Sequence, residues 1–250
     1  MSINPYWPNP NANSTTPAPA KTLVQATYDA MREDILSGLL GPGTKLRADK
    51  LKDRYDVGAS TLREALNLLV GEALVASEGQ KGFRVTPMSE ADFQDIVRVR
   101  KQLETQALRE SIAHGDDDWE AGLVGAFHRL TKIEERLQED PSGLSGEWEI
   151  RNRGFHAALI AACPSRWLHY FISILFHQSE RYRRISLSRS HTNGGSAKRD
   201  VHAEHEAIFN AAIDRNADLA CELTEQHIDR TLSFLTDKGF FQHLQDMENR

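Results

Sequence analysis

Three histidines lie on the apolar faces of three separate helical segments in the C-terminal half of the chain. His156, His205 and His227 each recur at helical spacing with apolar residues of their own segment. Imidazole nitrogens are common ligands of Zn²⁺, Ni²⁺ and Mn²⁺. If the three segments pack side by side in one bundle, the three side chains could meet around a divalent metal ion.

The same histidines also fit a simpler interpretation. A single histidine that points inward is more often a hydrogen-bonded core residue than a metal ligand, and this chain has ten histidines. His202 also lies close to His205 in the sequence, so spacing does not decide which of the two would be the metal ligand. Spacing alone therefore leaves both a metal site and a set of core histidines open.

Residues 88–238 must supply the helices that position these histidines. Helical periodicity runs through the whole region without the alternation of a strand, and breaks at turn-forming residues divide it into six to seven helices. The expected ranges are 89–114, 116–139, 146–162, 165–189, 197–214 and 217–237. This pattern predicts an all-α bundle, followed by a C-terminal tail over residues 239–250.

The N-terminal third has a different pattern. Residues 1–20 hold five prolines and four asparagines without apolar periodicity, which predicts a disordered arm. Residues 21–87 show three helical runs and two short extended runs, the order of a winged helix-turn-helix domain. The helices start at Leu23, Ala48 and Ser60, and the extended runs cover 74–77 and 82–85. The predicted fold is therefore mainly α, with a winged helix-turn-helix of three helices and a β-hairpin before the bundle.

In such a domain, the second helix of the pair places its first residues in the major groove of DNA. Arg63 offers a fork of donors to a guanine edge or a phosphate, and Ser60 and Thr61 can donate to phosphate oxygens. The other candidate DNA contacts precede the helix pair or form the wing tip: Lys45, Arg47, Lys81 and Gly82. A small helical packing unit with no nucleic-acid role is the alternative that spacing leaves open.

Composition and charge narrow the class of protein. The chain has 250 residues, a net charge of −6, and no apolar stretch long enough to cross a bilayer. Its start has no basic segment followed by an apolar core, and Cys163 and Cys221 form no disulfide framework, so we expect a cytoplasmic protein. Residues 21–87 carry ten Lys and Arg against nine Asp and Glu, whereas residues 88–250 carry 20 against 27. The N-terminal domain is therefore the part that could meet a polyanion.

Four segments of the N-terminal domain form a family pattern. They are DILSG at 34–38, YDVGASTLREAL at 55–66, EALV at 72–75 and KGFRV at 81–85. In this order they resemble the GntR family of bacterial transcription regulators. The resemblance implies a repressor that binds a palindromic operator as a homodimer.

The bundle extends this resemblance. Its matching segments are RKQLE at 100–104, NRGFH at 152–156, EH at 204–205 and QHI at 226–228. Residues 89–237 are similar to the FCD-type ligand-binding domain of the FadR subfamily, in which an aspartate and three histidines often hold a divalent metal ion. This implies that the ligands here are Asn152, His156, His205 and His227, around Zn²⁺, Ni²⁺ or Mn²⁺. Asn152 stands at the aspartate position and brings an amide oxygen without a negative charge.

In metal-bearing members of that subfamily, a small carboxylate effector completes the coordination and arginines neutralise it. The resemblance therefore implies a small organic acid as effector, with Arg100, Arg181 and Arg184 as its candidate arginines. Segments 58–60, 161–163 and 179–184 are most similar to the carbon-starvation regulator branch. That branch implies a C5 dicarboxylate such as glutarate.

Two other classes of function serve as alternatives: a metal-dependent helical enzyme and a purely structural helical dimer. A divalent ion held by histidines could activate water for hydrolysis. The chain, however, contains no HExxH, P-loop, GxSxG or GxGxxG motif. The sequence therefore predicts a transcription regulator and not an enzyme.

Overall fold

The computed structural model describes residues 22–79, 82–139, 144–189, 199–237, 239–242 and 244. Within these ranges the chain forms two compact units. The bundle unit takes residues from 95–176 and 199–234, and the mixed unit takes residues from 22–94, 177–189 and 235–244. Helix α7 (Arg166–Arg189) contributes residues to both units. The predicted arm, residues 1–20, lies outside the described residues.

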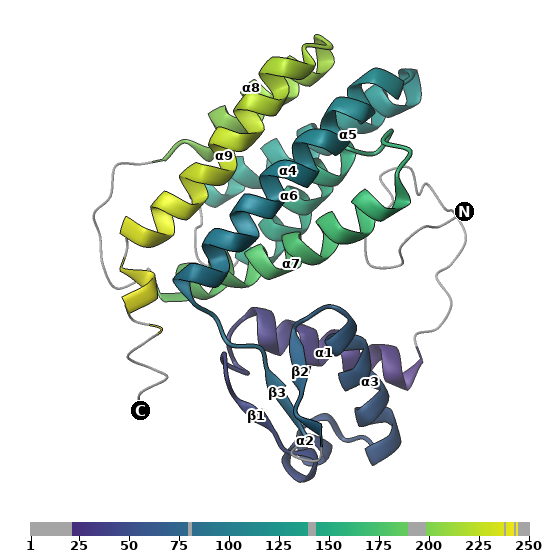
Figure 1. The fold of residues 1–250 in the computed structure, drawn as a ribbon, viewed down its shortest axis with the longest axis vertical. Coiled ribbons are helices and arrows are strands. Elements are labelled where there is room, and N and C mark those ends of the chain that lie inside the picture. Colours follow the sequence, from purple (N-terminus) through teal and green to yellow (C-terminus); the bar gives the residue numbers. More distant parts are fainter. Residues whose placement is uncertain are drawn as a thin grey trace. The chain divides into compact units, whose positions relative to one another are not determined.

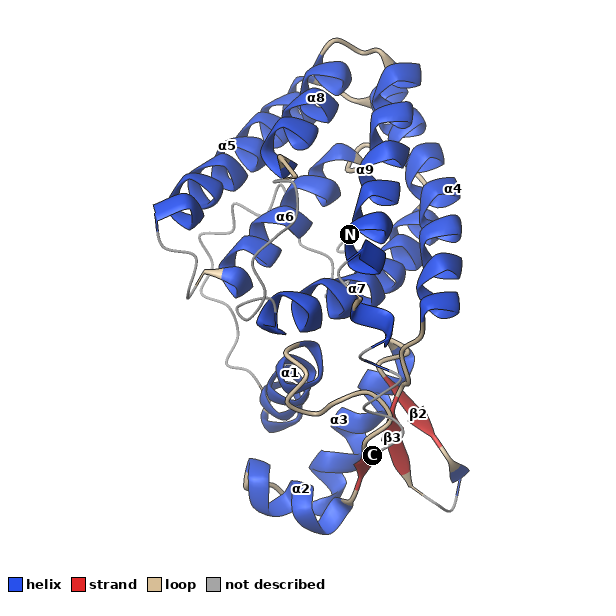
Figure 2. Ribbon diagram, turned by 90° about the vertical axis from the view of Figure 1, so that its left-hand side faces the viewer, coloured by secondary structure: helices blue, strands red, loops and turns tan. Residues whose placement is uncertain are grey.

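The mixed unit has the element order of a winged helix-turn-helix, which confirms the predicted fold. Its elements are α1 (Leu23–Leu36), β1 (Lys45–Leu46), α2 (Ala48–Tyr55), α3 (Ala59–Gly71), β2 (Val75–Ser77) and β3 (Phe83–Val85) (Figure 1). Figure 2 shows β2 and β3 beside α3. Apolar side chains of α1, α3, the turn after α3 and β3 form its buried core: Tyr28, Met31, Ile35, Leu62, Leu66, Leu69, Leu74 and Val85.

Local backbone geometry fixes the turn between α2 and α3. Asp56 ends α2 in the left-handed conformation, with a φ of 51°, which Asp adopts more readily than most residues. Gly58 then takes an extended conformation as the N-cap of α3. Ser60 consequently lies inside the helix, where its Oγ donates to Glu64 at 3.2 Å. This turn leaves Ser60 and Arg63 exposed at the start of α3.

The sheet has one strand more than the sequence predicts. The expected hairpin is present as β2 and β3, but β1 also pairs antiparallel with β3, so the strand order is β1-β3-β2. Lys45 lies opposite Arg84, whose guanidinium donates to Glu78 and to the carbonyl of Gly43, both at 2.6 Å. A two-residue strand is too short to show an alternating pattern in the sequence. Pairing with a neighbouring strand, and not its own residues, makes it a strand.

The C-terminal part of α7 binds backbone carbonyls of the mixed unit. Nε2 of Gln178 donates to the carbonyl oxygen of Glu72, just after α3, at 2.8 Å. Nη2 of Arg181 donates to the carbonyl oxygen of Thr86, just after β3, at 2.7 Å. Both of these α7 side chains are buried. This part of α7 is therefore bonded to the ends of α3 and β3.

Aromatic side chains near the C-terminus also join the mixed unit. Phe240 and Phe241, within the segment expected to be a tail, are helical and buried. The ring of Phe241 lies 6.1 Å from the rings of both Tyr182 and Phe93. The hydroxyl of Tyr182 in turn donates to Asp92 at 2.7 Å. These contacts extend the core of the mixed unit beyond α9.

The bundle unit contains the remaining helices together with the first half of α7. They are α4 (Glu90–His114), α5 (Asp117–Glu139), α6 (Ser145–Leu159), α8 (Val201–Ile213) and α9 (Ala217–Asp237). The first residues of α4 and the last of α9 belong to the mixed unit. Helix α5 packs against α6 and α8 around buried side chains that include Leu123, Phe155 and Ile208. The six predicted helices are thus present within the described ranges, none of which holds a helix long and apolar enough to cross a membrane.

Helix α6 ends three residues earlier than the sequence predicts. The apolar run continues to 162, but the α-helix stops at Leu159 and the chain turns. The amide of Ala162 donates to Oγ of Ser111 on α4 at 3.0 Å, so a tertiary hydrogen bond replaces a helical one. Pro164 follows and disfavours helical geometry at the residue before it.

Candidate metal centre and DNA-binding surface

His156, His205 and His227 meet in the bundle unit. They come from α6, α8 and α9, they are buried, and one ring nitrogen of each lies within 4.8 Å of the others. The ring centres of His205 and His227 are 4.8 Å apart, and that of His156 lies 5.5 and 5.3 Å from them. The structure therefore brings together the three histidines that the sequence singles out.

The carboxylates of buried Glu134 and half-buried Glu204 bind the outer nitrogens of two of these histidines. Oε1 of Glu134 on α5 lies 3.2 Å from Nδ1 of His205, and Oε2 of Glu204 lies 2.8 Å from Nδ1 of His227. An ionised carboxylate only accepts, so each Nδ1 carries a proton, and in a neutral imidazole Nε2 then keeps its lone pair. Nε2 of His205 is buried and has no hydrogen-bond partner among the described residues. That nitrogen is therefore available to a metal ion.

The charge states of these groups suit a metal centre. Burial lowers the pKa of His227 to about 3, although its hydrogen bond to Glu204 acts in the opposite direction. Burial would raise the pKa of Glu204, but hydrogen bonds from Arg199 and His227 lower it to about 2. Burial likewise would raise the pKa of Glu134, yet hydrogen bonds from two histidines hold it below its ordinary value. At neutral pH His227 is thus neutral, the form that binds a metal, and both carboxylates are ionised.

Asn152 adds an oxygen donor one turn before His156 on α6. Its side chain is buried, and its Oδ1 has no hydrogen-bond partner among the described residues. An unpaired buried carbonyl is costly, and a metal ion would satisfy it. Together with the unpartnered Nε2 of His205, this oxygen indicates that the residues present fit a divalent metal ion with nitrogen and oxygen ligands.

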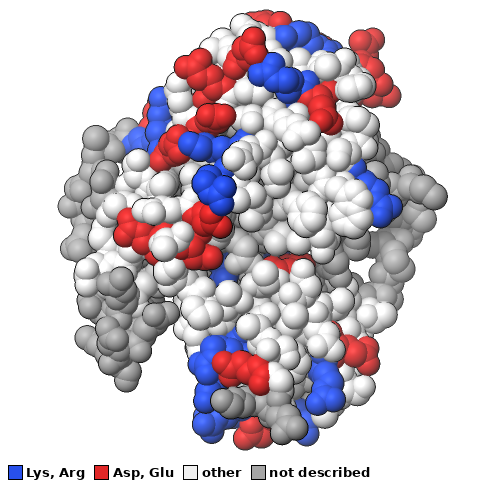
Figure 3. Space-filling model, viewed as in Figure 1, with Lys and Arg blue, Asp and Glu red and all other residues white. Residues whose placement is uncertain are grey.

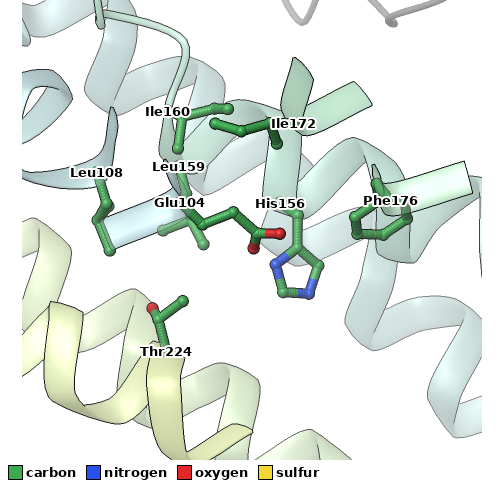
Figure 4. A pocket seen from close by; sticks show the side chains of 8 residues that line it. All are labelled: Glu104, Leu108, His156, Leu159, Ile160, Ile172, Phe176 and Thr224. Carbon is green, nitrogen blue, oxygen red and sulfur yellow. The ribbon is translucent and has the colours of Figure 1, made fainter. Parts of the chain in front are cut away.

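A small cavity adjoins His156 (Figure 4). Its volume is about 10 Å³, which is room for about one water molecule. Figure 4 shows the carboxylate of Glu104 directed toward the imidazole of His156. The lining is otherwise mostly apolar and consists of Leu108, Leu159, Ile160, Ile172, Phe176 and Thr224.

Arg100, a predicted effector residue, contacts two residues that line this cavity. Its Nε donates to Oε1 of Glu104 at 2.6 Å, and its guanidinium carbon lies 5.1 Å from the ring centre of Phe176. Arg100 and Glu104 are both buried. The sequence did not single out Glu104, although its position one turn after Arg100 on α4 was the signal that could have found it.

Arg181 and Arg184, the other predicted effector residues, have partners in the mixed unit. Burial lowers the pKa of Arg181 to about 10, and besides Thr86 its guanidinium binds Oε1 of Gln178 at 3.0 Å. Arg184 forms ion pairs with Glu33 and with Glu180. Their role toward an effector stays a prediction.

Three of the predicted DNA contacts are exposed basic side chains of the mixed unit, while Thr61 is half-buried. Lys45 on β1, Arg47 before α2 and Arg63 on α3 are exposed, and no described residue forms a hydrogen bond or ion pair with their side chains. By contrast, Arg54 on α2 is bound to Asp34 at 2.7 Å. Figure 3 shows Lys and Arg side chains beside acidic ones over this unit, at the lower end of the view. The unpaired cations are the ones free to bind phosphates.

The wing tip supplies one described candidate. Gly82 has a φ of 91°, which an L-residue with a side chain adopts only under strain, and a Cβ there would meet no atom within 4 Å. The amide of Gly82 bonds to the carbonyl of Gly79 at 3.3 Å and closes the turn. Lys81 lies outside the described residues, so its contact with DNA stays a prediction.

A helix-turn-helix with an exposed basic surface, joined to a helical domain with a buried polar centre, defines a DNA-binding regulator. The comparisons with known proteins agree. The profile of the bacterial regulatory proteins of the gntR family matches residues 23–85, and the FCD domain matches residues 95–230. The chain belongs to the GntR family and carries an FCD domain.

Two relatives extend over most of the chain. The HTH-type transcriptional regulator BphR of Paraburkholderia xenovorans (strain LB400) is 43% identical over 89% of both chains. The HTH-type transcriptional repressor GlaR of Escherichia coli (strain K12) is 36% identical over 80% of this chain and 90% of its own. These relatives are regulators and not enzymes, so the alternative of a metal-dependent enzyme is set aside.

Solved structures show the same fold. E. coli McbR/YncC has a TM-score of 0.68 at 16% identity and covers 88% of this chain and 99% of its own. A transcriptional regulator GntR from Rhodococcus sp. RHA1 has a TM-score of 0.64 at 19% identity and covers 86% of this chain and 97% of its own. At these identities the likeness concerns the fold alone.

Proposed function

We propose that this protein is a metal-dependent repressor that acts in the cytoplasm as a homodimer and responds to a small dicarboxylate. The three buried histidines, with a carboxylate on the Nδ1 of two of them, carry this proposal. A repressor is favoured because GlaR, a relative over most of the chain, is one. Two identical domains related by a two-fold axis would bind the two halves of a palindromic operator.

The bundle would hold Zn²⁺, Ni²⁺ or Mn²⁺ through His156, His205, His227 and Asn152. When bound, the metal would supply a positive charge that attracts a carboxylate. Arg100 would bind the second carboxylate of a dicarboxylate, because a guanidinium fork matches that group in two hydrogen bonds. A C5 acid such as glutarate is the first candidate.

The effector must rearrange the site before it can bind. The cavity beside His156 has room for about one water molecule, and the Nε of Arg100 already donates a hydrogen bond to Glu104. A dicarboxylate would therefore displace Glu104 or move the lining side chains. A ligand that binds only the rearranged state shifts the population toward it, which is how acid binding would change operator affinity.

The first experiment measures metal content and operator binding of the full chain purified without chelator. We expect about one divalent ion per chain and a shifted band with a DNA fragment from upstream of its own gene. Adding a panel of C4–C6 dicarboxylates should change that shift and raise the melting temperature. If the purified protein contains no metal and its melting temperature does not change with Zn²⁺, Ni²⁺ or Mn²⁺, the three histidines are core residues and not ligands.

A second experiment tests Arg100. Replacing it alone would leave Glu104 as an unpaired buried charge, which is strongly destabilising. The double variant Arg100→Gln/Glu104→Gln removes both charges, and Arg98→Ala, at an exposed site on the same helix, is the matched control. Calorimetric titration of dicarboxylates should show binding to the parent and the control only. Equal binding to the double variant would remove Arg100 from the effector site.

A further inference from the structure

We infer that Glu134 and Glu204 are positioning residues of the metal centre, each of which holds one histidine ligand with its Nε2 free for the metal. The inference rests on the proposed metal function and concerns residues that would not touch the metal. It is carried by the contacts of 3.2 Å to Nδ1 of His205 and 2.8 Å to Nδ1 of His227. Such outer carboxylates fix the tautomer and the ring orientation of a ligand histidine.

Glu204 is itself held from a second side. Arg199 donates to both of its carboxylate oxygens, at 2.9 and 2.6 Å, in a two-point ion pair. The same guanidinium donates to the backbone carbonyl of His227 at 3.0 Å. Arg199 therefore fixes both the carboxylate and the backbone of the histidine that the carboxylate binds. This double attachment leaves the imidazole of His227 little rotational freedom.

Glu134 distinguishes between two neighbouring histidines. Its Oε2 lies 2.7 Å from Nδ1 of half-buried His202, while its Oε1 binds His205, which is fully buried. The indole Nε1 of Trp148 also donates to Oε1, at 3.3 Å. His202 and Trp148 thus hold the carboxylate in place, and His205 is the histidine that it presents to the centre. The structure in this way separates two residues that spacing could not tell apart.

These carboxylates also supply the negative charge that the inner ligands lack. Three neutral imidazoles and the amide of Asn152 leave both charges of a divalent ion uncompensated. The oxygens of Glu204 accept two hydrogen bonds from the guanidinium of Arg199, and an oxygen of Glu134 accepts one from Trp148, as carboxylates do. Each lies one imidazole ring away from the centre, where it strengthens the basicity of its histidine. Loss of either carboxylate should therefore weaken metal binding without removing a ligand.

The test uses Glu134→Gln and Glu204→Gln in the full chain, with Glu206→Gln as the matched control. Glu206 is an exposed glutamate on the same helix as Glu204. The new amide can donate to Nδ1, which favours the tautomer with a proton on Nε2 and blocks that ligand atom. Competition with a chelating dye should show that each of the first two variants binds Zn²⁺ about 10–100-fold more weakly than the parent. The control should match the parent.

If the two glutamates only stabilise the fold, a variant that still folds without metal should give the same Co²⁺ spectrum as the parent. Melting curves of the metal-free proteins report folding, and the visible absorption of bound Co²⁺ reports the ligand field. A positioning role requires a changed Co²⁺ spectrum or a lost Co²⁺ signal in a variant that still folds without metal. Because the two glutamates lie on different helices, either variant decides the question if the other does not fold.

Two outcomes separate the inference from the function on which it rests. If the parent binds metal and both variants bind Zn²⁺ with its affinity, or if Glu206→Gln loses as much affinity as they do, the positioning role is refuted while the metal centre stands. If the parent itself binds none of the three metals, the proposed metal function fails.

Discussion

Acidification should destabilise the metal-free bundle, because His227 is buried in its neutral form. Its pKa falls from 6.5 to about 3 in the folded protein. Below pH 6.5 the unfolded chain therefore binds a proton that the folded chain does not bind, so the free energy of unfolding falls as the pH falls. One such group changes it by up to about 1.4 kcal/mol per pH unit. Since titration of the unfolded chain begins only near 6.5, the loss between pH 7.5 and 5.0 is about 2 kcal/mol.

Urea unfolding in the presence of a chelator would measure this loss at the two pH values. Trp119 and Trp148 both lie in the bundle unit, so tryptophan fluorescence reports its unfolding. The variant His227→Asn has no titrating group at this position and should show a pH dependence smaller by about 2 kcal/mol. His128→Asn, at an exposed site on α5, controls for the loss of a histidine as such. The same pH dependence in the parent and in His227→Asn would refute the argument.

The other predictions concern DNA binding and packing. Arg63→Ala should weaken operator binding by about 1–3 kcal/mol in a gel-shift titration, and unchanged affinity would show that α3 does not read DNA as proposed. Gly82→Ala should lower the free energy of unfolding by about 1–2 kcal/mol, because a φ of 91° strains a residue with a side chain. A melting curve identical to that of the parent would contradict this prediction. Trp119→Phe removes the hydrogen bond from Nε1 to the carbonyl of Ala158 at 3.0 Å, and should lower the free energy of unfolding by about 1–3 kcal/mol. Urea titration measures that loss, and a value near zero would mean that another donor satisfies the carbonyl.

Helix positions could be predicted from the sequence wherever local signals agree. Helix α2 begins at the predicted residue, Ala48, and it ends at Tyr55, where Asp56 and Gly58 permit a turn. Strand β1 and the end of α6 could not be predicted, because both depend on distant residues. Lys45 becomes part of a strand only opposite Arg84, and the chain leaves α6 toward a hydroxyl on Ser111.

The candidate site also combines residues that could be predicted from local signals with residues that depend on distant contacts. The three histidines could be chosen because each has apolar neighbours at helical spacing on its own helix. Their glutamate partners could not, since Glu134 lies 71 residues before His205 and Glu204 lies 23 residues before His227. Glu204 is next to His205 in the sequence, yet its carboxylate binds His227 on α9. Only the packing of α5, α8 and α9 assigns each carboxylate to its imidazole.

The hydrogen bonds that Gln178 and Arg181 form within the mixed unit bear on how such a regulator can diversify. Gln178 and Arg181 bind the carbonyl oxygens of Glu72 and Thr86, which are main-chain atoms that every residue possesses. Substitutions on the exposed face of α3, where Arg63 lies, leave both acceptors unchanged. An evolving or engineered protein could therefore change the exposed side chains of α3 while keeping these hydrogen bonds, so that face of α3 can vary independently of them.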